Sequence, residues 1–305
     1  MTFSIKEYNP TKDKKTLFCL WQSTIGEIWP ISQEKFDQRL KTGDFFVAEV
    51  NCKIIGFVST EIQDKPQSQK PRGEIKLILV DKSYQRQGVG RKLLIHALNF
   101  LKQNGAYDVQ LGGGGDQYFW PGVPSNLEEA VAFFKACGWD YKETSVDMIR
   151  NLEDYLTPDF VLGRLDEKVK IDLATEKENS QILLFEKENF PNWFCYFDEK
   201  TKLKEFDDIL LAKENDEIVG SLTLFTGNYL WEQILGGGIG GFGALGVVTE
   251  KREKGIGLAL AAKATQILKN REVRISYLGW TWLIDWYGKL GYKVWREYQM
   301  SWKIL

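Results

Sequence analysis

The pattern of apolar and polar residues runs through one series of elements twice. In the first half, apolar runs over 45–50 and 54–62 predict the two strands of a hairpin, and the run over 75–80 predicts a buried strand. A helix follows over 91–102, because its leucines recur at the spacing of one helix face. A short helix is predicted over 130–139.

The second half repeats this order. Residues 208–225 predict strand, turn and strand, residues 243–248 a further strand, and residues 258–268 a helix. The segment 286–292 is then the counterpart of 133–139 in the first half. A repeat of a whole series of elements predicts two tandem domains.

The expected domain boundary lies where polar residues interrupt the pattern. A stretch over 112–124, rich in Gly and Pro, predicts an insertion loop in the first half. A strand over 147–152 is followed by a polar segment that contains proline. We therefore expect an N-terminal domain over 1–152, a linker over 153–159 and a C-terminal domain over 160–305.

Composition narrows the function classes. The 305 residues carry 40 Lys and Arg against 42 Asp and Glu, so there is no basic excess of the kind that binds nucleic acid. The four cysteines are isolated and the single histidine is His96, which speaks against a metal site or a disulfide scaffold. The longest uncharged run, 233–249, is rich in glycine and too short for a membrane span. With no apolar signal segment at the start, we expect a cytoplasmic protein that does not bind membranes.

Each half carries a glycine loop between a buried strand and a helix. The loops are Gln85–Gly90 and Arg252–Gly257, each ending in Gly-x-Gly. A helix N-terminus presents free N–H groups, and glycine removes the side chains that would keep an anion away, so each loop can hold a phosphate. Neither loop fits a P-loop, and a dinucleotide fingerprint would need glycine at Leu93 and Leu260. The alternative is that the glycines only shape a turn.

These loops resemble the [Gln/Arg]-x-x-Gly-x-[Gly/Ala] motif of the GNAT acetyltransferase superfamily, and 286–292 resembles its later Tyr-x-Lys-x-Gly-Phe segment. The resemblance implies an α+β fold with two tandem domains, each a mixed, mostly antiparallel sheet with a V-shaped splay, flanked by helices. It also implies that the loops hold the pyrophosphate of acetyl-CoA, while the preceding strands hold the pantetheine. The implied cofactor-binding residues are Leu79, Val80, Asp81, Arg86, Gln87, Gly88, Val89, Gly90 and Arg91, and in the second half Val247, Val248, Thr249, Arg252, Lys254, Gly255, Ile256 and Gly257.

The resemblance places one candidate catalytic group in each half and both in neither. The tyrosine that protonates the leaving thiolate in the family matches Tyr287, whereas the first half has Phe134, which cannot donate a proton. A glutamate that accepts the amine proton in some members matches Glu74, whereas the second half has Gly241. A core aromatic and a solvated glutamate are the respective alternatives. We favour the second half as catalytic, with a water, Asp285 or Glu232 as the base.

The expected function is an acyl-CoA-dependent N-acetyltransferase that acts on a primary amine of a small molecule in a ternary complex. The alternative is a non-catalytic sensor of coenzyme A. Aromatic groups that could wall an acceptor pocket, or that could be core packing, are Tyr118, Phe119 and Trp120 in the insertion and Trp280, Trp282 and Trp286 in the second half. The glycines of 236–243 allow close approach of backbone, and His96 is expected to be incidental.

Overall fold

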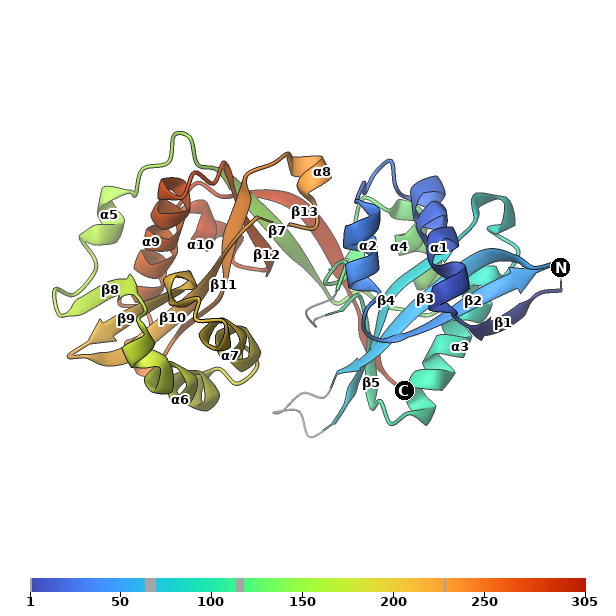
Figure 1. The fold of residues 1–305 in the computed structure, drawn as a ribbon, viewed down its shortest axis with the longest axis horizontal. Coiled ribbons are helices and arrows are strands. Elements are labelled where there is room, and N and C mark those ends of the chain that lie inside the picture. The colour runs from blue at the N-terminus through green and yellow to red at the C-terminus, as the bar shows by residue number, and fades with distance from the viewer. Residues whose placement is uncertain (1, 64–69, 114–117, 228) are drawn as a thin grey trace. The chain divides into compact units, whose positions relative to one another are not determined.

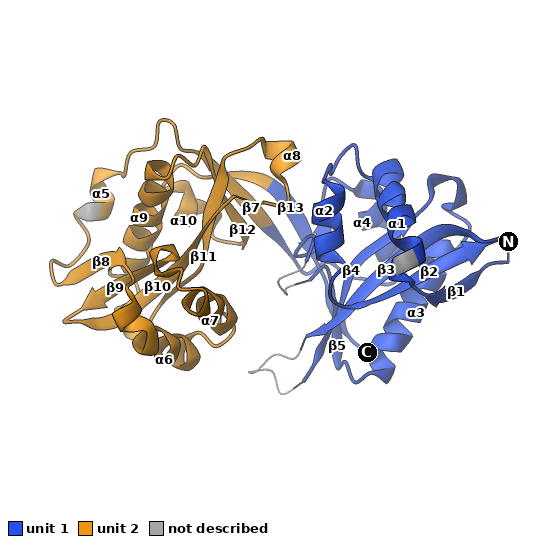
Figure 2. Ribbon diagram, in the orientation of Figure 1, with its two compact units in different colours: residues 1–145, 296–305 blue, residues 146–295 orange. Residues whose placement is uncertain are grey.

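The protein consists of two units that follow the repeat (Figure 1). The structure, a computed structural model, describes residues 2–63, 70–113, 118–227 and 229–305. Unit 1 comprises residues 1–145 and 296–305, and unit 2 comprises residues 146–295, as Figure 2 shows. The expected linker over 153–159 stays a prediction, because the two units are defined by packing and do not test it.

Unit 1 is built on a mixed sheet with helices on both faces. Its strands lie in the order β1 (Ser4–Glu7), β2 (Asp44–Val50), β3 (Lys53–Gln63), β4 (Arg72–Val80), β5 (Asp108–Leu111) and β14 (Trp302–Ile304). Neighbours are antiparallel except β4 and β5. The helices are α1 (Pro10–Thr24), α2 (Gln33–Arg39), α3 (Val89–Gln103) and α4 (Glu128–Ala136), and a short strand β6 (Val123–Pro124) pairs with Tyr298 and Gln299.

Unit 2 repeats this plan. Its strands lie in the order β8 (Val169–Leu173), β9 (Ile209–Glu214), β10 (Glu217–Thr226), β11 (Ile239–Val247), β12 (Ile275–Thr281), β7 (Glu143–Asn151) and β13 (Lys293–Met300). Here β11 and β12 are the parallel pair. The helices are α5 (Asp159–Leu162), α6 (Asn179–Asn189), α7 (Phe194–Lys202), α8 (Glu232–Leu235), α9 (Ile256–Asn270) and α10 (Ile284–Gly288). The expected α+β fold with two mostly antiparallel sheets flanked by helices is confirmed.

One strand of each sheet comes from an unexpected part of the chain. β7 follows α4 in sequence, but its residues 146–151 pair with β12 in unit 2. β13 (Lys293–Met300) begins in unit 2, and β14, which follows it, pairs with β5 in unit 1. Each sheet therefore receives an antiparallel strand from the segment that follows the other copy of the motif.

Local chemistry explains the hairpins and the faces of the sheet. Asn51 and Cys52, like Asn215 and Asp216, have positive φ angles, as the tight turns that match strand twist require. A Cβ on Gly56 would touch Leu93 of α3, whereas the ring of Phe57 contacts Phe36 of α2. Because successive strand residues point to opposite faces, α3 and α2 cover opposite faces of the unit 1 sheet.

The parallel pair in each unit separates after three residues. β4 and β5 pair only from Arg72↔Asp108 to Glu74↔Gln110, followed by one bridge between Ile75 and Gly112. β11 and β12 pair only over Ile239–Gly241 and Ile275–Tyr277. Beyond these points the strands splay, so one edge of β4 and one edge of β11 have no neighbouring strand among the residues that the structure describes.

A buried carboxyl in unit 2 gives a prediction about stability. Glu186 is fully buried and accepts a hydrogen bond from the Ser221 hydroxyl. Burial raises its pKa from 4.5 to about 8. Between these values the folded state holds a proton that the unfolded chain releases, so the free energy of unfolding falls by roughly 1 kcal/mol per pH unit.

We expect Glu186→Gln to remove this contribution, which is fully present below pH 4.5 and lost as the pH rises through about 8. Urea unfolding of both proteins at pH 5, 6.5 and 8 measures the difference in slope. Parallel pH dependences would contradict the assignment of the proton to Glu186.

Candidate active site

The two glycine loops adopt the same backbone conformation. Gly88 and Gly255 both have φ 84°, in the left-handed region that glycine accepts without strain. Two residues earlier, Arg86 and Glu253 also have positive φ, at 59° and 64°. The repeat that the sequence predicted is therefore a repeat of loop geometry.

The first motif residue closes each loop with its side chain. Gln85 Nε2 donates to the carbonyl oxygen of Val80 at 3.1 Å, and Arg252 Nε donates to that of Val247 at 3.0 Å. Both side chains bond the final residue of the preceding strand. This explains why Gln and Arg are interchangeable at this position, since each offers an N–H at similar reach.

A cavity of about 850 Å³ lies in unit 1, where β4 and β5 splay. Residues 75–80 of β4 and Leu111 and Gly112 after the splay form its walls. The glycine loop and α4 close it on one side, and Thr24, Ile25 and Ile28 after α1 close it on another. The predicted residues that line it are Leu79, Val80, Arg86, Gly88, Gly90 and Arg91.

The other residues expected to bind cofactor in unit 1 do not line this cavity. Val89 is buried in the core under α3. Asp81 pairs with Lys53 and caps the turn at Ser83, and the Gln87 side chain bonds the Ser83 carbonyl.

In unit 2, the expected residues take mostly structural positions. Val247 and Ile256 belong to the core, and the amide of Val248 bonds the Val219 carbonyl. Thr249 begins a short 3-10 turn. Lys254 is exposed, and Gly257 lies against Trp286.

Glu74 lies at the last paired position of β4, where the splay begins. Its side chain is buried, 1% exposed, and Oε2 lies 2.7 Å from the place where a Cβ on Gly113 would stand. Its cross-strand neighbour is Glu61. Glu74 directly precedes Ile75, where the lining of the cavity by β4 begins, but is not itself one of the lining residues. Its role as a base therefore stays a prediction.

A buried ion pair stands beside this carboxyl. A register shift between β3 and β4 leaves Lys76 as an extra residue on β4. Its ammonium is buried and lies 2.6 Å from Glu61 Oε2, and it also bonds the Thr42 carbonyl at 3.4 Å. Lys76 is one of the residues that line the cavity.

The two candidate positions for the thiolate acid differ in their surroundings. Phe134 lines the unit 1 cavity. Tyr287 is packed in the unit 2 core against Phe242, Trp286 and Tyr292, and burial raises its pKa to about 12. The packing around Tyr287 favours the core alternative, and its catalytic role stays a prediction.

The role of the two carboxylates suggested as a base in unit 2 stays a prediction. Asp285 and Glu232 are both exposed. Asp285 also stands two residues before Tyr287 on α10, and residues at that spacing do not share a helix face.

The insertion of unit 1 contributes aromatic packing. Phe119 and Trp120 are buried, and both stack on Trp21 of α1, with ring centroids 5.0 and 5.5 Å apart. Trp120 also lines the cavity. Trp120 therefore packs in the core and also forms part of the cavity wall, the two roles that the sequence left as alternatives. Residues 114–117 of the insertion lie outside the described residues.

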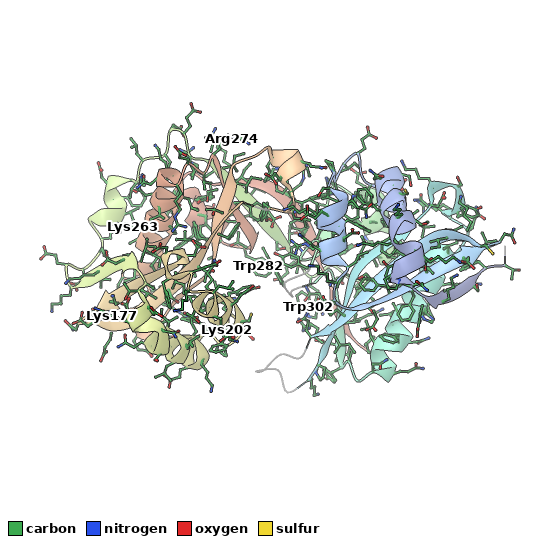
Figure 3. The ribbon with its side chains drawn as sticks, viewed as in Figure 1. Lys177, Lys202, Lys263, Arg274, Trp282 and Trp302 are labelled. Atoms are coloured by element: carbon green, nitrogen blue, oxygen red, sulfur yellow. The ribbon has the colours of Figure 1, made fainter. Side chains whose placement is uncertain are left out.

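Other predicted features of unit 2 have structural explanations. Gly241 is needed because a Cβ there would meet the Tyr277 carbonyl at 2.1 Å. Arg274, labelled in Figure 3, donates to the carbonyls of Leu235 and Gly237 and so fixes the glycine-rich turn. Trp282, also labelled there, is 48% exposed.

His96 packs edge to face on Phe46. This position in unit 1 agrees with an incidental role.

Several cavity residues were missed by the sequence reasoning. They are Thr24, Ile25, Ile28, Lys76, Asn126, Glu128 and Glu129. Most come from segments outside the repeated motif, so no repeated pattern marked them. Lys76 lies in the predicted strand over 75–80, and a lysine within an apolar run was the available signal.

The described residues also bear on metal binding and on membrane spanning. Among those residues, no group of three His, Cys, Asp or Glu side chains is placed to hold a metal ion. Nor is any helix within 2–63, 70–113, 118–227 and 229–305 both long enough and apolar enough to cross a bilayer.

Known structures share this architecture. A glucosamine N-acetyltransferase region of a fungal multi-domain GH3 β-N-acetylglucosaminidase is 31% identical, with a TM-score of 0.92 over 99% of this chain and 38% of that one. A tandem GNAT protein from the clavulanic acid biosynthesis pathway has a TM-score of 0.67 at 14% identity, over 99% of this chain and 98% of that one. The second likeness shows the fold alone.

Sequence comparison agrees with the fold. An uncharacterized N-acetyltransferase of Methanocaldococcus jannaschii is 32% identical over 107 residues, which are 35% of this chain and 43% of that protein. The chain thus spans less than half the length of both this relative and the fungal protein. A model of the acetyltransferase (GNAT) family matches residues 14–139 and 172–292, one match in each half. The chain therefore belongs to the acetyltransferase (GNAT) family, with two tandem domains.

Proposed function

We propose that unit 1 binds acetyl-CoA in its cavity and transfers the acetyl group to the primary amine of a small molecule, with amino sugars as the acceptor class. The observation that carries this proposal is the cavity itself, which joins the open glycine loop, the free edge of β4 and the wall of Trp120. A cytoplasmic location is proposed with it, since the four isolated cysteines favour a reducing compartment.

The donor fits one end of the cavity. The N-terminus of α3 offers backbone N–H groups to a diphosphate, and Lys82, Arg86 and Arg91 add positive charge there. Within the described part of the chain, no strand pairs with the edge of β4 beyond Ile75 on the β5 side, so its amide and carbonyl groups can bond the pantetheine.

The acceptor fits the side formed by α1 and the insertion. Trp120 offers a flat face, as pockets for ring-shaped ligands often do. Glu128 and Glu129 also line the cavity and would attract a protonated amine. The amino-sugar class is supported by the fungal relative, whose title names glucosamine N-acetylation.

The reaction needs one positioned base. The neutral amine attacks the thioester carbonyl, the C–S bond breaks, and the amine proton passes to Glu74 directly or through water. Phe134 cannot donate a proton, so coenzyme A leaves as the thiolate. Holding both substrates in one cavity supplies much of the remaining acceleration.

A thiol-release assay with acetyl-CoA and a panel of amines tests this function. The panel contains glucosamine, an aminoglycoside, a polyamine, an amino acid and a peptide with a free N-terminus. We expect turnover with an amino sugar, and a product heavier by one acetyl group. Turnover with non-sugar amines alone would overturn the acceptor class, and coenzyme A binding without turnover on any amine would overturn the transfer function.

A further inference from the structure

The segment between the two motif copies lies along helix α9 of unit 2. We call residues 153–164 the connecting segment. The carbonyl oxygen of Tyr155 accepts a hydrogen bond from Lys269 near the end of α9, at 2.7 Å, and its hydroxyl bonds the Ala262 carbonyl at 3.4 Å. Tyr155 and Val161 are each 1% exposed. These contacts anchor the connecting segment in the unit 2 core, with Tyr155 against the C-terminal half of α9.

This packing buries a face of α9, whereas the same face of α3, the equivalent helix in unit 1, is exposed to solvent. Leu258 and Ala262 are 7% and 1% exposed. The residues at the same motif positions of α3 are Arg91, which is exposed, and Ile95, which is 51% exposed. A helix buried on more than one side needs apolar residues all round, as the sequence Leu-Ala-Leu-Ala-Ala of α9 provides.

The connecting segment ends at the glycine loop. A Cβ on Gly255 would lie 3.2 Å from the Cβ of Arg164 and 3.3 Å from its carbonyl oxygen. A Cβ on Gly88 would meet nothing within 4 Å. The space outside Gly255 is thus filled by backbone, and the carbonyl is the negative end of a peptide dipole, which disfavours a nearby phosphate.

The charges of the loops differ in the same direction. Arg86 of unit 1 is replaced by Glu253 at the same left-handed position in unit 2. Lys251 is engaged by Glu214, and the Arg252 side chain is turned back to Val247. Counting the two residues before the first glycine, the charge changes from one positive in unit 1 to zero in unit 2.

We propose that the connecting segment closes the glycine loop of unit 2, so that the chain binds a single coenzyme A, at the loop of unit 1. This inference rests on the proposed function for the identity of the ligand. Unit 2 would then keep the loop geometry of the family, while the connecting segment occupies the position where a phosphate would bind.

Isothermal titration of the full chain with coenzyme A tests the inference without requiring turnover. We expect one equivalent bound per chain. Arg86→Glu should weaken binding by about tenfold or more, roughly 1.4 kcal/mol or more. Glu253→Arg is the matched control and should leave both stoichiometry and affinity unchanged. Both residues are exposed, and each variant introduces the residue type that the other loop already holds at that φ.

The outcomes separate the two proposals. Two equivalents per chain, with one lost in Arg86→Glu, would overturn closure of unit 2 and leave the proposed function standing. One equivalent that responds to Glu253→Arg and not to Arg86→Glu would overturn both the closure and the assignment of the donor to unit 1. An absence of binding by the folded wild-type chain would overturn the proposed function.

Discussion

A Glu74→Gln variant is expected to lose ~10²–10⁴-fold in kcat for acetyl transfer, the range usual for removal of a positioned base. The amide keeps the shape of the side chain but cannot accept a proton. Glu74 is buried at the point where β4 and β5 separate, so no bulk water stands in for it directly. The measurement is thiol release with saturating acetyl-CoA and the best acceptor of the panel.

Two controls make this result specific. Coenzyme A binding by Glu74→Gln should match wild type, because the residue lies outside the glycine loop. Tyr287→Phe should retain wild-type turnover, because the Tyr287 ring is enclosed in the unit 2 core. A large loss in Tyr287→Phe, with none in Glu74→Gln, would return the reaction to unit 2 and restore the catalytic role first expected for Tyr287.

A Glu61→Leu variant is expected to destabilise unit 1 by about 3 kcal/mol, at the low end for a broken buried ion pair because the Glu61 side chain is 20% exposed. The Lys76 side chain is 1% exposed, so its ammonium would be left without its carboxylate partner inside the protein. Chemical denaturation at neutral pH measures the loss.

The double variant Glu61→Leu/Lys76→Met separates charge from packing. Replacing both partners by apolar residues is expected to recover most of the stability, since no buried charge then remains unpaired. If the double variant is as unstable as Glu61→Leu, packing and not the Lys76 ammonium accounts for the loss.

The strands, helices and glycine loops could be predicted from the sequence because each depends on residues close together in the chain. Apolar runs predicted β2, β3 and β9, and the leucine spacing predicted α3. The Gly-x-Gly loops follow from backbone conformation, since the φ of Gly88 and Gly255 disfavours other residues. Two copies of such local patterns were enough to indicate the family and its tandem organisation.

Which loop stays open was decided only by tertiary structure. The motif around Gly255 is as complete as that around Gly88, and the difference lies in Arg164, about ninety residues away in sequence and adjacent in space. The pairing of Lys76 with Glu61, the stacking of Trp120 on Trp21 and the exchange of β7 and β14 are likewise contacts between distant residues. The sequence alone thus determined two equivalent helix N-termini, each after a glycine loop. Long-range packing, of side chains and of one connecting segment, determined that a cavity lies beside the first of them.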